Sequence, residues 1–139
     1  MWFEKYTIEQ INSASRNTLL EHLDIKFENI GEDFLSASMP VDHRTCQPLR
    51  LLHGGASVAL AESIGSMASW AILDPNISYP VGLEINANHI RSATKGRVTG
   101  IAKAVHIGRS THVWEIKITN EENKLVCISR LTMSIIKKT

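Results

Sequence analysis

The sequence predicts an α+β fold in which one long helix is wrapped by a curved antiparallel sheet. Two alternating segments within residues 25–39 flank a turn at 31–33, which is typical of a hairpin. A long apolar stretch over about 54–73 stops near Pro75, which indicates a single long helix. Four strand-like segments follow without a helix between them, so the sheet should be antiparallel rather than doubly wound.

The N-terminal part is expected to cover this fold with short helices. Thr7 and Gln10 match a capping box, which predicts a helix over about 8–14. A further helical turn is expected within 17–22. The hairpin that follows should end at Pro40, because proline cannot donate to a strand ladder.

The long helix carries apolar or small residues around most of its circumference, which indicates a buried helix. A loop over 41–53 leads into it, and a polar loop over 74–80 follows it. The later strands are expected at about 81–91, 96–107, 110–119 and 124–136.

Composition narrows the classes of function. The 139 residues, with 43% hydrophobic and 21% charged side chains, indicate one domain over 1–139. The net charge of +1 gives no basic field to attract nucleic acid. No segment approaches the ~18 apolar residues of a membrane span, and no signal peptide is expected. Cys46 and Cys127 have no metal-ligand spacing, so we expect reduced thiols and a cytoplasmic protein.

Two glycines, Gly54 and Gly55, open the long helix, and they would let another group approach the backbone closely. The first N–H groups of a helix are unpaired and lie at the positive end of its dipole, which suits a developing oxyanion. A tight loop-to-helix turn is the alternative explanation. His53 and Gln47, in the loop before the glycines, could donate to a substrate carbonyl, although a lone loop histidine is more often structural.

Glu62 is a carboxylate on an otherwise apolar helix, and Ser66 shares its face four residues later. Such a carboxylate could act as a general base or as a nucleophile, with the hydroxyl orienting it. The alternative is a narrow surface stripe. Glu62 lies roughly 10 Å along the helix from the glycines, so one helix cannot easily bring both features to one carbonyl. We therefore expect a two-fold dimer with shared active sites.

Several basic side chains lie at strand ends or turns, where they could hold phosphates or be solvated edge charges. They include His89 and Arg91, which share a strand face, and Arg109 in a later turn. The six histidines form no convincing metal site, and we expect no metal or other cofactor.

The motifs together resemble hotdog-fold acyl-CoA thioesterases over nearly the whole chain. The segments that carry the resemblance are MPVDHRT at 39–45, QP at 47–48, LHGGAS at 52–57, AESIGS at 61–66, GLEINANH at 82–89, GR at 108–109 and VWEI at 113–116. They are most similar to the branch of 4-hydroxybenzoyl-CoA thioesterases and, more closely, of the bacterial 1,4-dihydroxy-2-naphthoyl-CoA thioesterases of menaquinone synthesis.

The resemblance implies a six-stranded antiparallel sheet around a central helix, dimers that pair their sheets edge to edge, and tetramers made of two dimers. It implies an acyl-CoA substrate and the following site. Glu62 is the catalytic carboxylate, the Gly54 amide polarises the thioester carbonyl, Gln47 and His53 flank the thioester, and Ser66 supports its far side. His89, Arg91 and Ser92 would line the coenzyme A channel, with Arg109 and Ser110 near its phosphates.

The sequence departs from the family at one place. Between Gln47 and His53 the family usually shows an aromatic residue and then a glycine, where this chain has Leu49 and Arg50. Arg50 would favour an acidic or smaller acyl group, or point to solvent. Two other functions remain open on the same fold, a β-hydroxyacyl dehydratase and a non-enzymatic acyl-CoA-binding protein.

Overall fold

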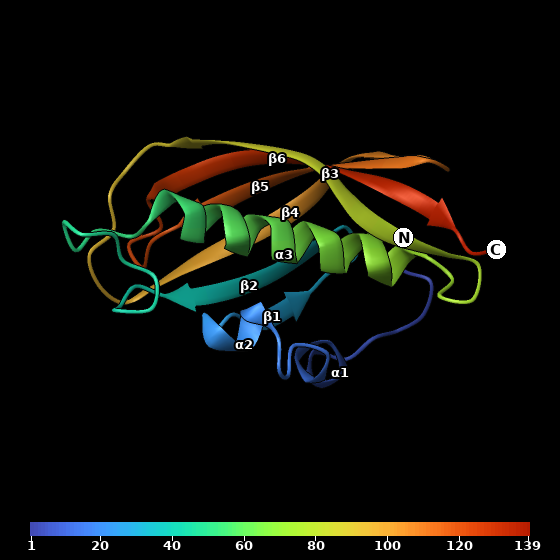
Figure 1. The fold of residues 1–139 in the computed structure, drawn as a ribbon, viewed down its shortest axis with the longest axis horizontal. Helices are drawn as coiled ribbons and strands as arrows, with labels where there is room; N and C mark the ends of the chain where they lie inside the picture. The colour runs from blue at the N-terminus through green and yellow to red at the C-terminus, as the bar shows by residue number, and fades with distance from the viewer.

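The computed structural model describes all of residues 1–139 and places one long helix across a curved sheet (Figure 1). The elements are α1 (Ile8–Ser13), α2 (Leu19–His22), β1 (Lys26–Ile30), β2 (Phe34–Pro40), α3 (Gly54–Ile72), β3 (Ser78–His89), β4 (Arg97–Ile107), β5 (Thr111–Thr119) and β6 (Leu125–Lys137). The strands lie in the order β1-β2-β4-β5-β6-β3, and every neighbouring pair is antiparallel. The predicted α+β architecture is confirmed.

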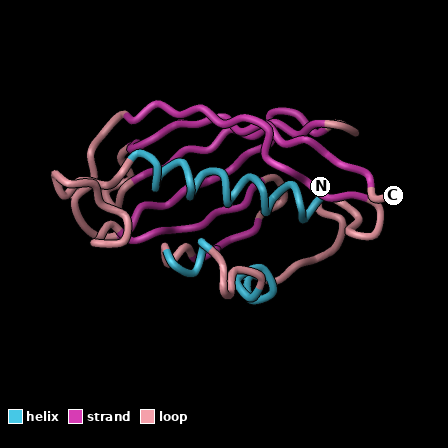
Figure 2. Tube along the Cα trace, in the orientation of Figure 1, coloured by secondary structure: helices cyan, strands magenta, loops and turns pink.

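The core lies between α3 and the inner face of the sheet, and in the tube view strands run both above and below this helix, because the sheet curves around it (Figure 2). Leu60, Ile64 and Ala68 of α3 are fully buried there. Gly65 lets the helix lie close to the sheet, because a Cβ at this position would stand 2.5 Å from the side chain of Leu131 on β6. The small residues of α3 therefore set the close packing of helix on sheet.

The N-terminal segment is tied to both the sheet and the long helix. Thr7 and Gln10 form the predicted capping box at α1. The indole of Trp2 donates to the carbonyl of Gly31 at 2.6 Å, and the Phe3 N–H donates to the carbonyl of Ala71 at the C-terminal end of α3, at 2.9 Å. The segment thus connects the β1–β2 turn with the last turn of the long helix.

Two details differ from the expectation. Strand β3 begins at Ser78, inside the predicted 74–80 loop, and Pro80 lies within the strand. Proline is tolerated there because β3 is an edge strand that pairs only with β6. The long helix is also not buried all round, because the face that carries Glu62 and Met67 is only half-buried and Trp70 on it is 36% exposed.

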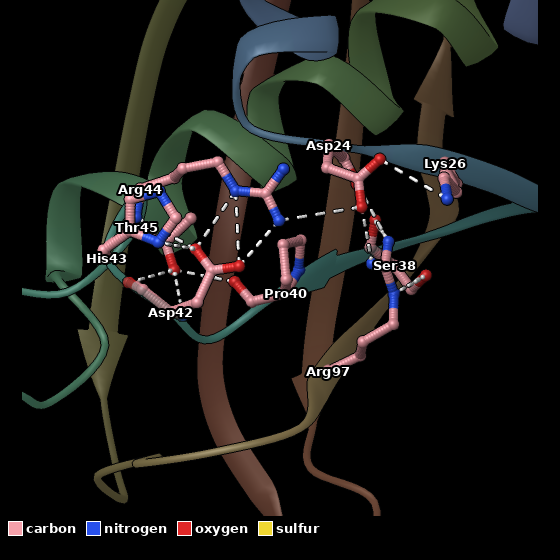
Figure 3. Close-up of polar contacts among 9 residues, drawn as sticks. All are labelled: Asp24, Lys26, Ser38, Pro40, Asp42, His43, Arg44, Thr45 and Arg97. Atoms are coloured by element: carbon pink, nitrogen blue, oxygen red, sulfur yellow. Dashed lines mark hydrogen bonds and ion pairs between the residues drawn. The ribbon is translucent and has the colours of Figure 1, made fainter.

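A network of ion pairs and hydrogen bonds joins two loops to the sheet (Figure 3). The Arg97 guanidinium donates to Asp24 Oδ2 at 3.0 Å and to Ser38 Oγ at 2.9 Å. Arg44 binds Asp42, with Nη2 2.6 Å from Oδ2. The network links the segment before β1 to β2 and to the start of β4. None of the helices combines the length and hydropathy needed to span a membrane.

Candidate active site

The N-terminus of α3 presents one open amide. A helix leaves its first N–H groups without intrahelical partners. Here His53 Nδ1 accepts from the Gly55 N–H at 2.8 Å, and the His53 carbonyl accepts from the Ala56 N–H at 3.0 Å. The His53 N–H donates to the carbonyl of Thr45 at 2.8 Å. The Gly54 N–H is therefore the first-turn donor that no group of this chain occupies, and the helix dipole polarises it toward an anionic oxygen.

His53 is a capping residue in this arrangement. Because its Nδ1 accepts from Gly55, the neutral ring carries its proton on Nε2. The side chain is exposed. The Gly55 amide, which the sequence offered as a second donor, is occupied by this cap.

A cleft of about 310 Å³ lies in front of the helix N-terminus. Five of the predicted site residues line it together: Gln47, Gly54, His89, Arg91 and Ser92. His89 packs against Gly54 so closely that a Cβ on Gly54 would stand 2.7 Å from His89 Nε2. Arg91 donates to the carbonyl of Leu125 at 2.9 Å, which holds the guanidinium at the edge of the cleft. This end of the structure can hold a carbonyl oxygen next to a cationic, hydrogen-bonding wall.

The loop before the helix orients the Gln47 amide. The Leu49 N–H donates to Gln47 Oε1, so the carbonyl side of the amide is occupied and its NH₂ group is left to donate. The turn is closed by the Arg50 N–H, which donates to the Gln47 carbonyl at 2.8 Å. Arg50 has φ of 65°, a left-handed conformation that glycine adopts without strain. Leu49 and Arg50 are both exposed and neither lines the cleft.

A second hollow, of about 430 Å³, contains Glu62 and Ser66. The carboxylate of Glu62 makes no ion pair or hydrogen bond within the chain, so it is free to act on a bound molecule. Gly82 of β3 faces it, and a Cβ at that position would collide with Glu62 Oε1. The Ser66 hydroxyl donates to Met133 Sδ at 3.6 Å rather than to the carboxylate.

The two hollows are separate within one chain. The cleft at Gly54 and the hollow at Glu62 have no lining residue in common. The structure thus brings Gln47, Gly54 and the 89–92 segment together, and it brings Glu62 and Ser66 together elsewhere. Arg109 and Ser110 lie in the β4–β5 turn, exposed and outside both hollows.

Sequence reasoning missed part of the Glu62 hollow. Trp70, which follows Glu62 by eight residues, could have been found from the helical stripe. Leu20 of α2 and Tyr79 of β3 also line it, and only the tertiary fold brings them there.

A buried polar cluster under α3 was missed as well. Ser69 Oγ accepts from Trp114 Nε1 at 2.7 Å and lies 3.0 Å from His112 Nδ1. Burial lowers the pKa of His112 below its usual 6.5, and the charge of His106 acts in the same direction against an opposing hydrogen bond with the Gly108 backbone. His112 is therefore neutral and structural near pH 7.

Several known proteins that are similar to this chain are named as thioesterases or as acyl-CoA hydrolases. The family model described as Thioesterase superfamily matches residues 49–127. The 1,4-dihydroxy-2-naphthoyl-CoA hydrolase of Escherichia coli (strain K12) is 52% identical over 98% of this chain and 99% of its own length. The proofreading thioesterase EntH of Cronobacter turicensis is 44% identical over 97% of this chain and 98% of its own length.

A crystal structure of a mutant thioesterase from Pseudomonas aeruginosa superimposes with a TM-score of 0.97 at 50% identity, and covers 99% of both chains. The match extends over helices, strands and loops alike, so the likeness is one of the whole fold and not of a shared motif. This chain therefore belongs to the thioesterase superfamily, with the hotdog fold and the thioester-hydrolysing chemistry of that family.

Proposed function

We propose that this enzyme hydrolyses an aromatic acyl-CoA, and that 1,4-dihydroxy-2-naphthoyl-CoA of menaquinone synthesis is the first substrate to test. The observation that best supports this proposal is the single open amide, the Gly54 N–H, at the positive end of a 19-residue helix. The unpartnered carboxylate of Glu62 supplies the second requirement of acyl transfer. The 52% identity to the Escherichia coli hydrolase supports the choice of acyl group.

In the proposed reaction the thioester carbonyl oxygen accepts from the Gly54 N–H and from the Gln47 amide. Glu62 either attacks the carbonyl carbon or removes a proton from the attacking water. The tetrahedral oxyanion is held by Gly54, and it collapses with loss of the coenzyme A thiolate, which takes a proton. If Glu62 itself attacks, loss of the thiolate leaves an anhydride between Glu62 and the acyl group, and water then hydrolyses this anhydride. By either route one water is consumed, and the products are the free acid and coenzyme A. His89, Arg91 and Ser92 line the path of the pantetheine arm, while Arg109 and Ser110 contact the phosphates from a neighbouring chain.

A dimer through β3 would unite the two hollows. β3 is a 12-residue edge strand with an unpaired ladder, and Leu83 on it is 65% exposed. A long open edge of this kind favours pairing with another chain. Gly54 lies beside His89 at one end of β3, and Glu62 lies beside Gly82 near the other end.

An antiparallel pairing of two β3 strands about a two-fold axis near Asn86 brings these ends together. The Gly82 end of one copy then lies opposite the His89 end of the other, with the bulge between Gly82 and Glu84 absorbing one residue. Each site would take Gly54 from one chain and Glu62 from the other. Two such dimers would form the tetramer.

The free thiols of Cys46 and Cys127 support a reducing, cytoplasmic setting.

Complementation between two inactive variants tests the shared site. Gly54→Pro removes the N–H donor at a helix position that tolerates proline, and loss of one oxyanion donor costs about 10²–10³ in kcat. Glu62→Ala removes the carboxylate. If the two variants are mixed and allowed to exchange subunits, a heterodimer regains one intact site, and total thiol release should reach about a quarter of the wild-type rate with random pairing.

Gly54→Ala is the matched control, because it adds a Cβ against His89 but keeps the N–H. It should retain more activity than Gly54→Pro. Activity is measured as thiol release from aromatic and aliphatic acyl-CoAs. Full activity of Glu62→Ala would refute the mechanism, and exchanged variants that never complement would refute the shared site.

A further inference from the structure

Gly82 is the only glycine of the edge strand β3, where it pairs with the buried Met133 of β6. A glycine weakens a strand relative to alanine, because it has no side chain to pack and loses more conformational freedom on folding. Two common reasons for a glycine within a strand are a left-handed backbone and a β-bulge. A bulge does occur here, between Gly82 and Glu84.

The backbone does not require glycine at this position. Gly96 is the only glycine of the chain with φ in the left-handed region, so the conformation of Gly82 is open to other residues. A bulge requires glycine only when its first residue is left-handed. What distinguishes glycine here is therefore the space beside its Cα atom.

That space is occupied by the carboxylate of Glu62. A Cβ on Gly82 would collide with Glu62 Oε1, and the only other atom within 4 Å of it, apart from its chain neighbours, would be Glu62 Cδ at 3.6 Å. The hydroxyl of Ser66, on the same helix face, donates to Met133 Sδ and not to this carboxylate. The contact with β3 at Gly82 is therefore a steric limit on where the carboxylate can lie.

We propose that Gly82 is a positioning residue for the reaction, because its missing side chain leaves the space from which the Glu62 carboxylate meets the thioester. This inference rests on the proposed function, in which Glu62 is the catalytic carboxylate. An added methyl group would push the flexible end of Glu62 away by on the order of 1 Å, and a misplacement of that size costs about 10²-fold in rate. The coenzyme A arm, which binds in the other hollow, would be held as before.

Steady-state thiol release by Gly82→Ala tests the proposal, with the aromatic acyl-CoA that the wild type hydrolyses fastest. We expect kcat to fall about 10²-fold while KM stays within about twofold, because the methyl group displaces a side chain that acts on the transition state. Circular dichroism and sedimentation velocity establish that the variant is folded and assembled like the wild type.

Gly100→Ala is the matched control. Gly100 of β4 also faces α3, and a Cβ there would stand 2.6 Å from Ile64 Cδ1, the apolar tip of a side chain with no part in the proposed reaction. This variant should keep the kcat of the wild type. Equal losses of kcat in Gly82→Ala and Gly100→Ala would overturn the positioning role, because any methyl group between sheet and helix would then have the same effect.

A shorter carboxylate shows whether Gly82 acts through Glu62. In Glu62→Asp the carboxylate is one methylene group further from β3, so that an added methyl group no longer meets it. Gly82→Ala should therefore lower kcat less than about twofold in this background, as expected when two residues are coupled. A loss that remains about 10²-fold would contradict the proposal, since Gly82 would then act independently of Glu62.

Crystal structures of the wild type and of Gly82→Ala keep this inference separate from hydrolysis. We expect Glu62 Oε1 to be displaced by on the order of 1 Å in the variant, with the backbones of α3 and β3 in place. If this displacement is found but the wild type releases no thiol, Gly82 still sets the position of Glu62 and the hydrolysis proposal fails. If the wild type hydrolyses acyl-CoA but Gly82→Ala keeps both the position of Glu62 and the full kcat, the positioning role is wrong and the hydrolysis proposal stands.

Discussion

Ser69 holds two buried side chains by one hydroxyl group. It accepts from the indole of Trp114 at 2.7 Å and shares a hydrogen bond of 3.0 Å with His112 Nδ1. Trp114, Ser69 and His112 are all buried, so no solvent replaces a lost partner. A polar group that is buried without a hydrogen bond costs far more than an average bond contributes.

We expect Ser69→Ala to lower the free energy of unfolding by about 1–3 kcal/mol for each group left without a partner. Ser63→Ala is the control, because its hydroxyl donates only to the Ala59 carbonyl of its own helix, at 2.6 Å, and alanine favours the helix. Urea denaturation at pH 7 measures both. Equal stability of the two variants would contradict the role assigned to Ser69.

The loops around β2 and β4 are held together by charge. Arg44 lowers the pKa of Asp42 from 3.8 to about 2 through hydrogen bonds from its side chain and backbone. Burial alone would raise the pKa of Asp24, but hydrogen bonding and charge from Arg97, with a contribution from Lys26, lower it below 3.8. Both carboxylates are partly exposed, so salt screens part of the effect.

Acid should therefore weaken this network. As the pH falls below 3.8, Asp42 becomes protonated in the unfolded chain, but in the folded chain it stays ionised until about pH 2. The stabilisation by this carboxylate is therefore complete above pH 3.8 and is lost as the pH falls from 3.8 to about 2. Asp42→Asn should make the fall of Tm between pH 4 and pH 2 less steep. Asp33→Asn, at an exposed position, is the control and should leave the steepness of this fall unchanged. Parallel curves for all three proteins would exclude the mechanism.

The elements that local signals govern could be predicted from the sequence. The capping box at Thr7 and the helix from Gly54 depend on neighbours in the chain, and the lack of helices between the later strands indicates an antiparallel sheet. The strand order could not be predicted in this way, because β2 pairs with β4 and β3 with β6. The start of β3 could not be predicted, because a proline such as Pro80 argues against a strand unless the strand is known to lie at the edge of the sheet. The contact of Gly82 with Glu62 and that of Tyr6 with Trp70 also depend on long-range packing.

The whole molecule has its open side at β3, where the backbone ladder of a 12-residue strand is unpaired. If the two-fold axis lies near Asn86, that residue faces its own copy in the second chain. Glu84, which binds Asn86 at 3.2 Å within one chain, then lies diagonally across the interface.

We expect Asn86→Glu to weaken the dimer severalfold, because like charges directly opposite on paired strands are destabilising. Asn86→Gln keeps the size and neutrality of the side chain and should dimerise normally. Sedimentation velocity over a dilution series gives the dissociation constant, and specific activity should fall with the dimer. A fully active monomer would disprove the interface and the shared site together.

The cap at His53 has a consequence for how the substrate enters. A phosphate group carries several charged oxygens and is usually held by a cluster of backbone N–H groups at a helix start. Here Gly55 and Ala56 are already satisfied, and only Gly54 remains. One amide suits one carbonyl oxygen and is a poor cradle for a pyrophosphate. The hydrogen bond from Gly55 to His53 that caps the helix therefore also sets the direction in which the substrate binds. Coenzyme A would gain little from placing its phosphates at this helix start.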